Sequence, residues 1–270
     1  MNKEQVVLVT GASSGIGQTT AMLLSNSGFR VFGTTRQSTA PNTSCGKIEM
    51  LSLDVRSEES AQSCVSELLE RAGKIDALVN NAGVALVGAL EETSTEEAKT
   101  IFETNFFGVL RITQAVLPVM RKQGYGRIAN ISSVTGLLPV PYSGIYAASK
   151  HALEGYSESL DHEVRQFGIR VSLIEPGFIR TGMAQHTQQT AGRIEAYSPE
   201  RDLAVASVAK SIANGEDPMV VASVVLQALT TRSPRAHYLA GRGAGVVQTM
   251  RKLLPSWLFD LGMRKQMGLP

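Results

Sequence analysis

The stretch VVLVTGASSGIG, residues 6–17, runs from a β-branched apolar segment through a glycine-rich turn into a helical pattern. Gly11 permits a tight turn, Gly15 lets the backbone approach a pyrophosphate, and Gly17 allows the helix to pack closely on the strand. The start of such a helix also offers free N–H groups to phosphate oxygens. The spacing is GxxxGxG rather than GxGxxG, and glycines alone also occur in purely structural turns. The strand–turn–helix context nevertheless predicts a dinucleotide-binding turn.

Around this stretch, short β-branched runs alternate with helical patterns. The strand segments are apolar at successive positions, which indicates burial under helices on both faces of a sheet. The sequence therefore predicts the α/β class, with a Rossmann-type doubly wound parallel sheet flanked by helices on both faces and ligands at the carboxyl ends of the strands. We expect strands at residues 6–10, 30–35, 47–53, 76–80, 126–132, 169–175 and 237–240, and helices at 15–27, 57–71, 95–122, 145–167 and 219–230.

The chain has 270 residues with no linker-like composition and no repeat, so we expect one domain over residues 1–270. Residues 1–183 would form the cofactor-binding and catalytic core, and 184–245 a substrate loop with the last helix and strand. Residues 246–270 would form a basic amphipathic C-terminal segment. Within the substrate region, residues 182–218 are polar and weakly periodic, and we expect no regular element there.

The composition excludes several classes of function. Hydrophobic residues make up 43% and charged residues 19% of the chain, as in ordinary folded domains. The net charge of +2 gives no support to a nucleic-acid partner. Cys45 and Cys64 form no CxxC pair, which fits a reducing compartment, and the four scattered histidines show no metal-ligand spacing, so no metal is expected. No stretch resembles a signal peptide or reaches the roughly 18 apolar residues of a membrane span, so the expected location is cytoplasmic.

The end of the second expected strand bears on the choice of dinucleotide. An acidic residue at this place holds the ribose 2′-hydroxyl of NAD. The strand instead ends Thr34-Thr35-Arg36, and the guanidinium of Arg36 can neutralise a 2′-phosphate. The absence of an acidic residue is stronger evidence for NADP(H) than the presence of Arg36, because exposed arginines are common in loops. The sequence predicts NADP(H) rather than NAD(H).

Tyr146 is the only one of six tyrosines with a lysine four residues later, Lys150. Residues i and i+4 share a helix face, so the two side chains can lie together. A phenol has an ordinary pKa of about 10. A nearby ammonium and a positively charged nicotinamide favour the phenolate, so Tyr146 can exchange a proton with a substrate oxygen near neutral pH. Taken alone, the pair also fits two residues on one side of a surface helix.

Six motifs that occur in order decide between these interpretations: TGASSGIG (10–17), NNAG (80–83), TNFFG (104–108), NISS (130–133), YAASK (146–150) and EPG (175–177). Over residues 5–183 the chain resembles the classical short-chain dehydrogenase/reductase family. The resemblance implies a catalytic tetrad of Asn105, Ser133, Tyr146 and Lys150. It also implies a homodimer or homotetramer built on the helices at 95–122 and 145–167.

The resemblance also implies the roles of these side chains. Ser133 would hydrogen-bond the carbonyl oxygen and stabilise developing charge. Asn105 would hold a water that links Lys150 to solvent, and the hydride belongs to the cofactor. The alternatives are that Ser133 only caps a strand end and that Asn105 only satisfies buried backbone groups. His151, next to Lys150, points off this face and is interpreted as structural.

The cofactor contacts are carried over by position. Ser13 and Ser14 stand where NADPH-dependent relatives often have a basic residue, so Arg36 alone favours the phosphate. The resemblance implies contacts from Gly11, Ser13, Ser14, Gly15, Ile16, Gly17 and Arg36, from Asp54 and Val55 at the adenine, from Asn81, Ala82 and Gly83 at the adenosine ribose, from Ile131, Tyr146 and Lys150, and from Pro176, Gly177, Phe178, Ile179 and Thr181 at the nicotinamide end.

The substrate end is less specific. Residues 137–143, LLPVPYS, and 183–197 are expected to border the pocket, and the apolar first segment suits a hydrophobic alcohol or ketone such as a steroid, retinoid or fatty compound. Plain core packing explains that segment equally well. GRGAG at 241–245 lacks the Lys-Ser/Thr of a phosphate loop and predicts a turn.

The C-terminal segment combines the only tryptophan, Trp257, with leucines and basic residues. We expect one basic, apolar helix within residues 246–268. It could cover the substrate pocket, contact a partner chain, or lie on a membrane surface.

Together these features predict an NADPH-dependent enzyme that interconverts a ketone or aldehyde and an alcohol by hydride transfer. One alternative is a sugar-nucleotide-modifying enzyme of the extended family, which the GxxxGxG spacing and the short substrate region disfavour. The other is a non-catalytic NADPH-binding regulator, which the intact tetrad disfavours.

Overall fold

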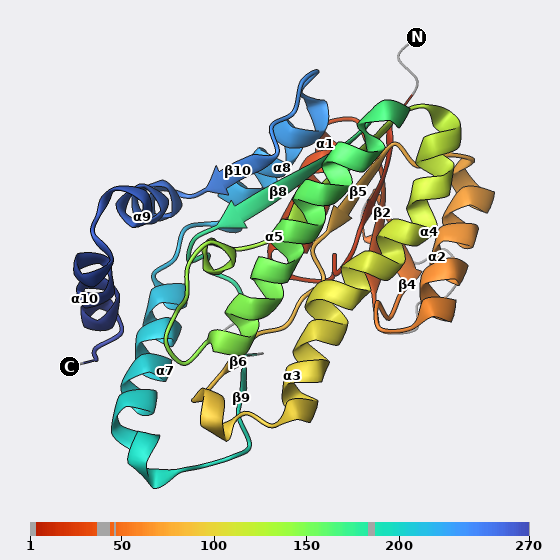
Figure 1. Ribbon diagram of the computed structural model, residues 1–270. Helices are drawn as coiled ribbons and strands as arrows, with labels where there is room; N and C mark the ends of the chain where they lie inside the picture. The colour runs from red at the N-terminus through yellow and green to blue at the C-terminus, as the bar shows by residue number, and fades with distance from the viewer. Residues whose placement is uncertain (1–3, 37–43, 46, 183–186, 270) are drawn as a thin grey trace.

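The computed structural model describes residues 4–36, 44–45, 47–182 and 187–269 (Figure 1). Within these residues the main sheet has eight strands in the order β10-β8-β7-β5-β1-β2-β4-β3. All neighbouring pairs are parallel except the edge pair, in which β3 (Ser44–Cys45) runs antiparallel to β4. This is the doubly wound Rossmann-type α/β sheet that the sequence predicts.

The parallel strands agree with the predicted segments to within one or two residues. The order of strands reverses between β1 and β5, where Val7 pairs with Val31 on one side and Ala77 on the other. Ligands of doubly wound sheets bind in the crevice at this reversal. The parallel strands are β1 (Val6–Val9), β2 (Arg30–Thr35), β4 (Ile48–Ser52), β5 (Ala77–Asn80), β7 (Gly126–Ile131), β8 (Ile169–Pro176) and β10 (His237–Ala240).

Helices cover both faces of the sheet. One face is covered by α1 (Gly15–Asn26) and α8 (Pro218–Thr230), whose apolar side chains pack with Val7 and Val9. The other face is covered by α2 (Glu58–Ala72), α4 (Gly108–Gln123) and α5 (Gly144–Val164), which pack with the alternate residues Val6 and Leu8. Each strand therefore supplies two hydrophobic cores, which is why its sequence is apolar at successive positions.

The helix predicted at 95–122 is interrupted at its centre. It begins as α3 (Thr95–Phe102), which Ser94 and Glu97 cap reciprocally. It continues through the π-helical turn η2 (Glu103–Phe107) into α4. π-helical turns are rare and occur frequently at functional sites, and this one carries Asn105.

The C-terminal third differs from the prediction. The polar region 182–218 contains α7 (Ser198–Ala213), whose buried residues are only Arg201 and Ala204, so its apolar periodicity is weak. The expected turn GRGAG instead begins α9 (Arg242–Leu253), and α10 (Ser256–Gln266) follows as a second helix because Pro255 between them has no N–H to donate. The short elements not predicted are β3, β6 (Leu86–Val87), β9 (Gln188–Gln189), η1 (Leu90–Glu92), η3 (Val134–Gly136), η4 (Arg165–Phe167) and η5 (Glu195–Tyr197).

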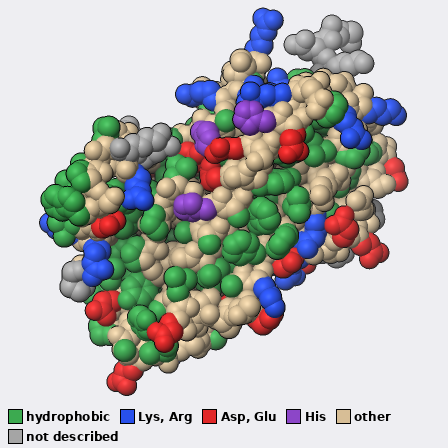
Figure 2. Space-filling view, in the orientation of Figure 1, with side chains coloured by type: hydrophobic (Ala, Val, Ile, Leu, Met, Phe, Trp, Pro, Cys, Tyr) green, Lys and Arg blue, Asp and Glu red, His purple; other side chains and the backbone are tan. Residues whose placement is uncertain are grey.

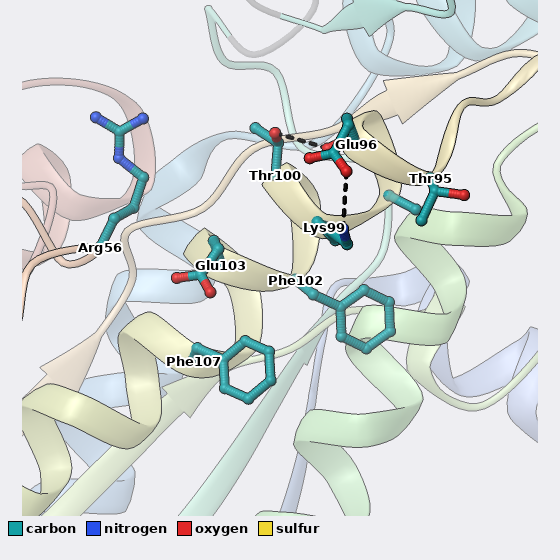
Figure 3. A pocket seen from close by; sticks show the side chains of 9 residues that line it. Arg56, Thr95, Glu96, Lys99, Thr100, Phe102, Glu103 and Phe107 are labelled. Atoms are coloured by element: carbon teal, nitrogen blue, oxygen red, sulfur yellow. Dashed lines mark hydrogen bonds and ion pairs between the residues drawn. The ribbon is translucent and has the colours of Figure 1, made fainter.

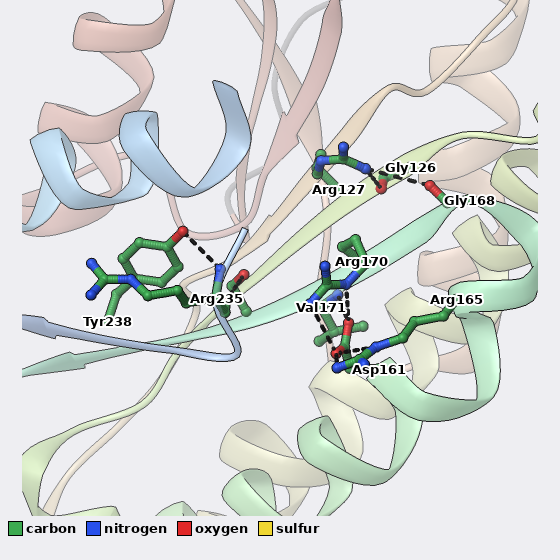
Figure 4. Close-up of polar contacts among 10 residues, drawn as sticks. Gly126, Arg127, Asp161, Arg165, Gly168, Arg170, Val171, Arg235 and Tyr238 are labelled. Carbon is green, nitrogen blue, oxygen red and sulfur yellow. Dashed lines mark hydrogen bonds and ion pairs between the residues drawn. The ribbon is translucent and has the colours of Figure 1, made fainter. Parts of the chain in front are cut away.

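A buried carboxylate joins the end of α5 to β8 (Figure 4). Asp161 accepts hydrogen bonds from Arg165 Nε (2.9 Å), Arg170 Nε (2.9 Å) and the N–H of Val171 (2.8 Å). Burial raises the pKa of Asp161, but these bonds outweigh burial and hold the pKa below its ordinary value. The carboxylate therefore fixes the position of α5, the helix that carries Tyr146 and Lys150.

No helix among the described residues is long and apolar enough to cross a bilayer.

Candidate active site

A cavity opens at the carboxyl ends of the strands. It brings Ser133, Tyr146 and Lys150 together with the predicted cofactor residues Ile16 and Asn81. The other predicted residues on its wall are Gly83, Ile131, Pro176, Gly177, Phe178, Ile179 and Thr181. The remaining predicted positions lie outside its lining: Gly11, Ser13, Ser14, Gly15, Gly17, Arg36, Asp54, Val55, Ala82 and Asn105.

The glycine turn has the conformation that a phosphate-binding turn requires. Gly11 and Gly15 have φ angles of 65° and 55°, in the left-handed region that favours glycine. A Cβ on Gly17 would lie 2.2 Å from the carbonyl oxygen of Gly11, so only glycine fits there. Ser14, at the start of α1, makes no side-chain capping bond. The first N–H groups of α1 are therefore left to a bound anion, and the turn fits the pyrophosphate of a dinucleotide.

Thr10 ties this turn to the loop after β5, a role that the sequence analysis missed. Its Oγ1 accepts hydrogen bonds from the N–H groups of Asn81 (2.9 Å) and Ala82 (3.0 Å). The side-chain amide of Asn81 donates in return to the carbonyls of Thr10 (2.9 Å) and Gly11 (3.0 Å). The two loops that flank the crevice are thus held in one geometry. A threonine at the end of an otherwise apolar strand was the available signal.

The predicted adenosine end lies at the ends of β2 and β4. Arg36 is exposed, and its charge helps to lower the pKa of Asp54. The larger cause is a hydrogen bond from Arg56, 2.6 Å from Asp54, and together they bring that pKa to about 2. Val55 is buried against Gly108 of α4, where an added Cβ would lie 2.8 Å from Val55 Cγ2. Arg36 and Arg56 make this end of the crevice positive.

Tyr146 and Lys150 lie on one face of α5, as their spacing predicts. Lys150 Nζ lies 5.8 Å from the centre of the Tyr146 ring and donates to the carbonyl of Ile131 (2.9 Å). Burial raises the pKa of the Tyr146 phenol, and a hydrogen bond with Ser133 opposes that shift. Burial lowers the pKa of Lys150 to about 8, and the charge of Glu154 opposes it. At neutral pH the phenol therefore keeps its proton beside an ammonium, as a proton donor to a carbonyl requires.

Ser133 lies two residues after the end of β7, at the start of the turn η3. Its Oγ accepts from the N–H of Thr135 (3.2 Å) and shares a hydrogen bond with Tyr146. Ser133 therefore caps the turn η3 rather than the end of a strand, and it also contacts the phenol. Both hydroxyls face one cavity, where a carbonyl oxygen could accept from each.

Asn105 is almost fully buried in the π-helical turn. Its amide donates to the carbonyl of Val84 (2.9 Å) and to Ser149 Oγ (3.1 Å), and its Oδ1 accepts from the N–H of Val84 (2.9 Å). The side chain thus satisfies buried backbone, as the alternative expected. A Cβ on Gly83 would lie 3.3 Å from Asn105 Oδ1 and 4.0 Å from Lys150 Nζ, so the glycine leaves space between them. That Asn105 holds a water for Lys150 stays a prediction.

The far wall of the cavity is largely apolar and comes from several separate parts of the chain. Leu138, Val140 and Ser143 lie within the predicted segment 137–143. Of the other predicted segment, residues 183–186 lie outside the described residues, and Thr187 lines the cavity. The lining residues that were not predicted are Val84, Ala85, Leu86 and Val87 after β5, Ser132, Val134 and Thr135 after β7, Val208 and Ile212 of α7, and Met263, Gln266 and Met267 at the end of α10.

The end of α10 packs on α7 (Figure 1). Ser207 Oγ donates to the carbonyl of Gln266 (2.8 Å), and Met267 is only 3% exposed. The C-terminal segment therefore closes the substrate side of the cavity, one of the three arrangements expected for it. This wall was not predicted for two reasons. The apolar periodicity of α7 is weak, and α7 and α10 lie far along the chain from the other lining residues.

A second hollow lies along α3, and Arg56 from the adenosine end of the crevice lines one side of it (Figure 3). Its charged side chains pair with one another, with Lys99 2.7 Å from Glu96 and Glu103 2.8 Å from Arg111 of α4. The phenyl rings of Phe102 and Phe107 complete it. Because its polar groups are exposed and mutually paired, it offers no arrangement for catalysis.

Comparisons with known proteins agree with this geometry. Residues 5–192 match the family model described as short chain dehydrogenase. A 3-ketodihydrosphingosine reductase from Bacteroides thetaiotaomicron is 38% identical over 258 residues, which cover 95% of this chain and 94% of the relative. Retinol dehydrogenase 8 from Bos taurus is 36% identical, with 96% of this chain and 94% of the relative covered.

Solved structures show the same fold. A short-chain dehydrogenase from Streptomyces avermitilis is 33% identical with a TM-score of 0.83, and the match covers 99% of this chain and 98% of that one. A short chain dehydrogenase/reductase from Burkholderia phymatum in complex with NAD is 28% identical with a TM-score of 0.79, covering 92% and 93%. ElxO with NADP bound is 27% identical with a TM-score of 0.74, covering 90% and 99%. Solved relatives thus bind either dinucleotide, and this chain belongs to the short chain dehydrogenase family of oxidoreductases.

Proposed function

We propose that the protein is an NADPH-dependent reductase that interconverts a ketone or aldehyde and an alcohol on a hydrophobic substrate. The observation that carries this proposal is the cavity in which Ser133, Tyr146 and Lys150 meet an apolar wall. Two relatives are named for 3-ketodihydrosphingosine and retinol, a ketone and an alcohol with long apolar parts. The same apolar wall suits a lipid-, retinoid- or steroid-like chain.

The residues of the cavity would have separate roles in cofactor binding and proton transfer. The uncapped start of α1 and the predicted contacts at Asn81 and Thr181 would hold the dinucleotide, which supplies the hydride when bound. Ser133 would donate a hydrogen bond to the carbonyl oxygen and stabilise its developing charge. Tyr146 would give that oxygen a proton, and the ammonium of Lys150 would stabilise the phenolate that remains.

The preference for NADPH is supported by the charge at the end of β2. Arg36 is exposed beside Asp54 and Arg56, and no acidic residue stands at positions 30–36. A 2′-phosphate here would meet a guanidinium, which binds phosphate oxygens in bidentate geometry. A 2′-hydroxyl would find no carboxylate on this strand to accept its hydrogen bond.

The test is consumption of NADPH with methyl ketones of increasing chain length and with 3-ketodihydrosphingosine. We expect kcat/KM to rise with chain length, by roughly threefold to fourfold for each buried methylene at ~0.8 kcal/mol. Tyr146→Phe should lower kcat by at least ~100-fold, because a general acid contributes that much or more, while NADPH affinity stays unchanged. Full turnover in Tyr146→Phe would remove the proton-donor role. A substrate series with no dependence on chain length would argue against a lipid-like substrate.

Two proposed partners follow from the surface of the molecule (Figure 2). Hydrophobic side chains gather over the middle of the face formed by α4 and α5, where Phe107 is 39% exposed, and this face supports a homodimer or homotetramer. They also gather at α9 and α10, where Trp257 and Leu261 are exposed beside basic residues, and this end supports contact with an anionic lipid surface. Light scattering of the purified protein tests the first, and sedimentation with phosphatidylserine vesicles tests the second.

A further inference from the structure

A cluster of titratable side chains lies behind the catalytic face of α5. Glu154 follows Lys150 by four residues and is 6% exposed, and Glu175 of β8 is fully buried. Glu154 Oε2 and Glu175 Oε2 are both buried and accept no donor. The two carboxyl groups are neighbours, since Glu175 Oε1 and Glu154 Oε2 lie 2.6 Å and 3.7 Å from the same nitrogen of His237. Two carboxylates so placed repel one another, which favours protonation of one of them.

His237 of β10 bridges this pair to solvent. Its Nδ1 lies 2.6 Å from Glu175 Oε1 and 3.7 Å from Glu154 Oε2, and its Nε2 lies 3.4 Å from Glu158 Oε1. Glu154, Glu158 and His237 also have the proximity of metal ligands. The ring presents Nδ1 toward Glu154 and Nε2 toward Glu158. A protonated imidazole donates from Nδ1 to Glu175 and directs its Nε2 toward Glu158, while its charge also lies close to Glu154.

The cluster touches the loop that carries Ser133. Ser132 Oγ donates a hydrogen bond to Glu154 Oε1, and the N–H of Ser132 donates to the carbonyl of Ile174 (2.8 Å). A Cβ on Gly136 would lie 2.8 Å from Ser132 Oγ and 2.9 Å from Glu154 Oε1, so the turn η3 packs directly on this bond. Glu154 therefore contacts the residue next to Ser133 while it shares a helix face with Lys150.

The charges around Glu154 come from every element packed on it. Lys150 and Glu158 lie on α5, Glu175 on β8 and His237 on β10, and the segment after β7 contributes the hydroxyl of Ser132. Burial raises the pKa of Glu154 to about 7, and the bond from Ser132 opposes that shift. Glu154 is in turn the charge that opposes the fall in the pKa of Lys150. The charge of Glu154 thus changes in the pH range in which Lys150 must stay an ammonium.

We propose that Glu154 is a positioning residue for the reaction: as a carboxylate it keeps Lys150 protonated and holds the Ser132–Ser133 segment against α5, and Glu175 and His237 set how often it carries its charge. Glu154 does not itself touch the substrate. This inference rests on the proposed role of Lys150 beside Tyr146.

The experiment compares Glu154→Gln with Glu163→Gln, which makes the same change on an exposed residue further along α5, outside the cluster. Lysine labelled with ¹³C at Cε reports the titration of Lys150 directly, with Lys150→Arg to assign the signal. We expect Glu154→Gln to lower the titration midpoint of Lys150 by about one pH unit, because a neighbouring carboxylate is lost. We expect Glu163→Gln to leave the Lys150 midpoint within about 0.2 units of wild type, because solvent screens an exposed charge. In Glu154→Gln, the basic limb of the pH profile of kcat/KM for reduction of 2-dodecanone should shift together with the Lys150 midpoint. The Kd of NADPH at pH 6.5 should stay within about twofold of wild type.

An unchanged Lys150 midpoint in folded Glu154→Gln overturns the inference. If Glu154→Gln does not fold, His237→Gln, at the half-exposed rim, replaces it: it should lower the Lys150 midpoint by roughly 0.3 units, because Glu154 then keeps its proton to higher pH. An unchanged midpoint there overturns the inference equally. The NMR titration needs no turnover. Failure of the proposed function, seen as no NADPH consumption or as full activity of Tyr146→Phe, is therefore distinguishable from failure of this inference.

Discussion

At the scale of single residues, the sequence predicted well those positions whose chemistry depends on local spacing. Tyr146 and Lys150 share a helix face because they are four residues apart, and Gly17 is required because its Cβ position is occupied by the carbonyl of Gly11. Glu154 and Glu175 could not be predicted as a pair. They lie on different elements, and only the pairing of β7 with β8 and the packing of α5 bring them together.

The proposed preference for NADPH over NADH depends on Arg36, and replacing this residue tests the preference. In Arg36→Asp the guanidinium is lost and a carboxylate able to accept from a ribose 2′-hydroxyl is gained. We expect the ratio of kcat/KM for NADPH to that for NADH to fall by roughly 100-fold, since charge-assisted hydrogen bonds contribute about 1.5–3 kcal/mol. Steady-state kinetics with both dinucleotides measure the ratio. Lys99→Asp, the same charge change on exposed α3, should leave it unchanged, and an unchanged ratio in Arg36→Asp would remove the argument for NADPH.

At the scale of elements, strands were predicted more accurately than helices of the C-terminal third. β2 has the predicted bounds because its apolar run is framed by Gly28 and by polar residues after Thr35. α7 was missed because it buries a charged residue, Arg201, in place of an apolar stripe. Arg201 pairs with buried Glu92, a partner more than one hundred positions away that no local pattern reveals.

α10 should control affinity for the substrate without affecting the hydride step. Met267 is buried at the cavity wall, whereas Leu261 of the same helix is 59% exposed. We expect Met267→Ala to raise KM for a long-chain ketone by roughly tenfold, since a buried methionine side chain contributes about 1.5–3 kcal/mol. The kcat for a short ketone should stay within about twofold. Leu261→Ala is the matched control and should behave like wild type; equal effects of the two variants would contradict a role of α10 as the cavity wall.

At the scale of the whole molecule, buried titratable groups give folding stability a definite pH dependence. Glu154, Glu175 and His237 have raised pKa values, so the folded chain binds their protons more tightly than the unfolded chain does. Their stabilising effect is present at low pH and is lost as the pH rises through the folded pKa values. Asp161, with a lowered pKa, acts in the opposite direction and loses its contribution only in acid.

We therefore expect the free energy of unfolding to be greatest near pH 5 and to fall between pH 5 and pH 8. Each of the three groups contributes at most roughly 1.4 kcal/mol per pH unit. Urea unfolding at pH 5, 6, 7 and 8 measures the slope. In Glu154→Gln the slope should be shallower, because one of the proton-binding groups is gone. A wild-type stability that rises from pH 5 to pH 8 would contradict the raised pKa values.

The cavity takes its reactive side from residues up to Thr181, and its far wall combines residues 84–87 and 138–143 with Val208, Ile212 and the end of α10. Part of the far wall is thus encoded in a second, later stretch of the gene. Substitutions in the second stretch can accumulate without disturbing proton or hydride transfer, so descendants of this chain can acquire new substrates while they keep the same reaction. A chimaera that carries the last 70 or so residues of a related reductase should inherit the donor's substrate range and retain the recipient's dinucleotide.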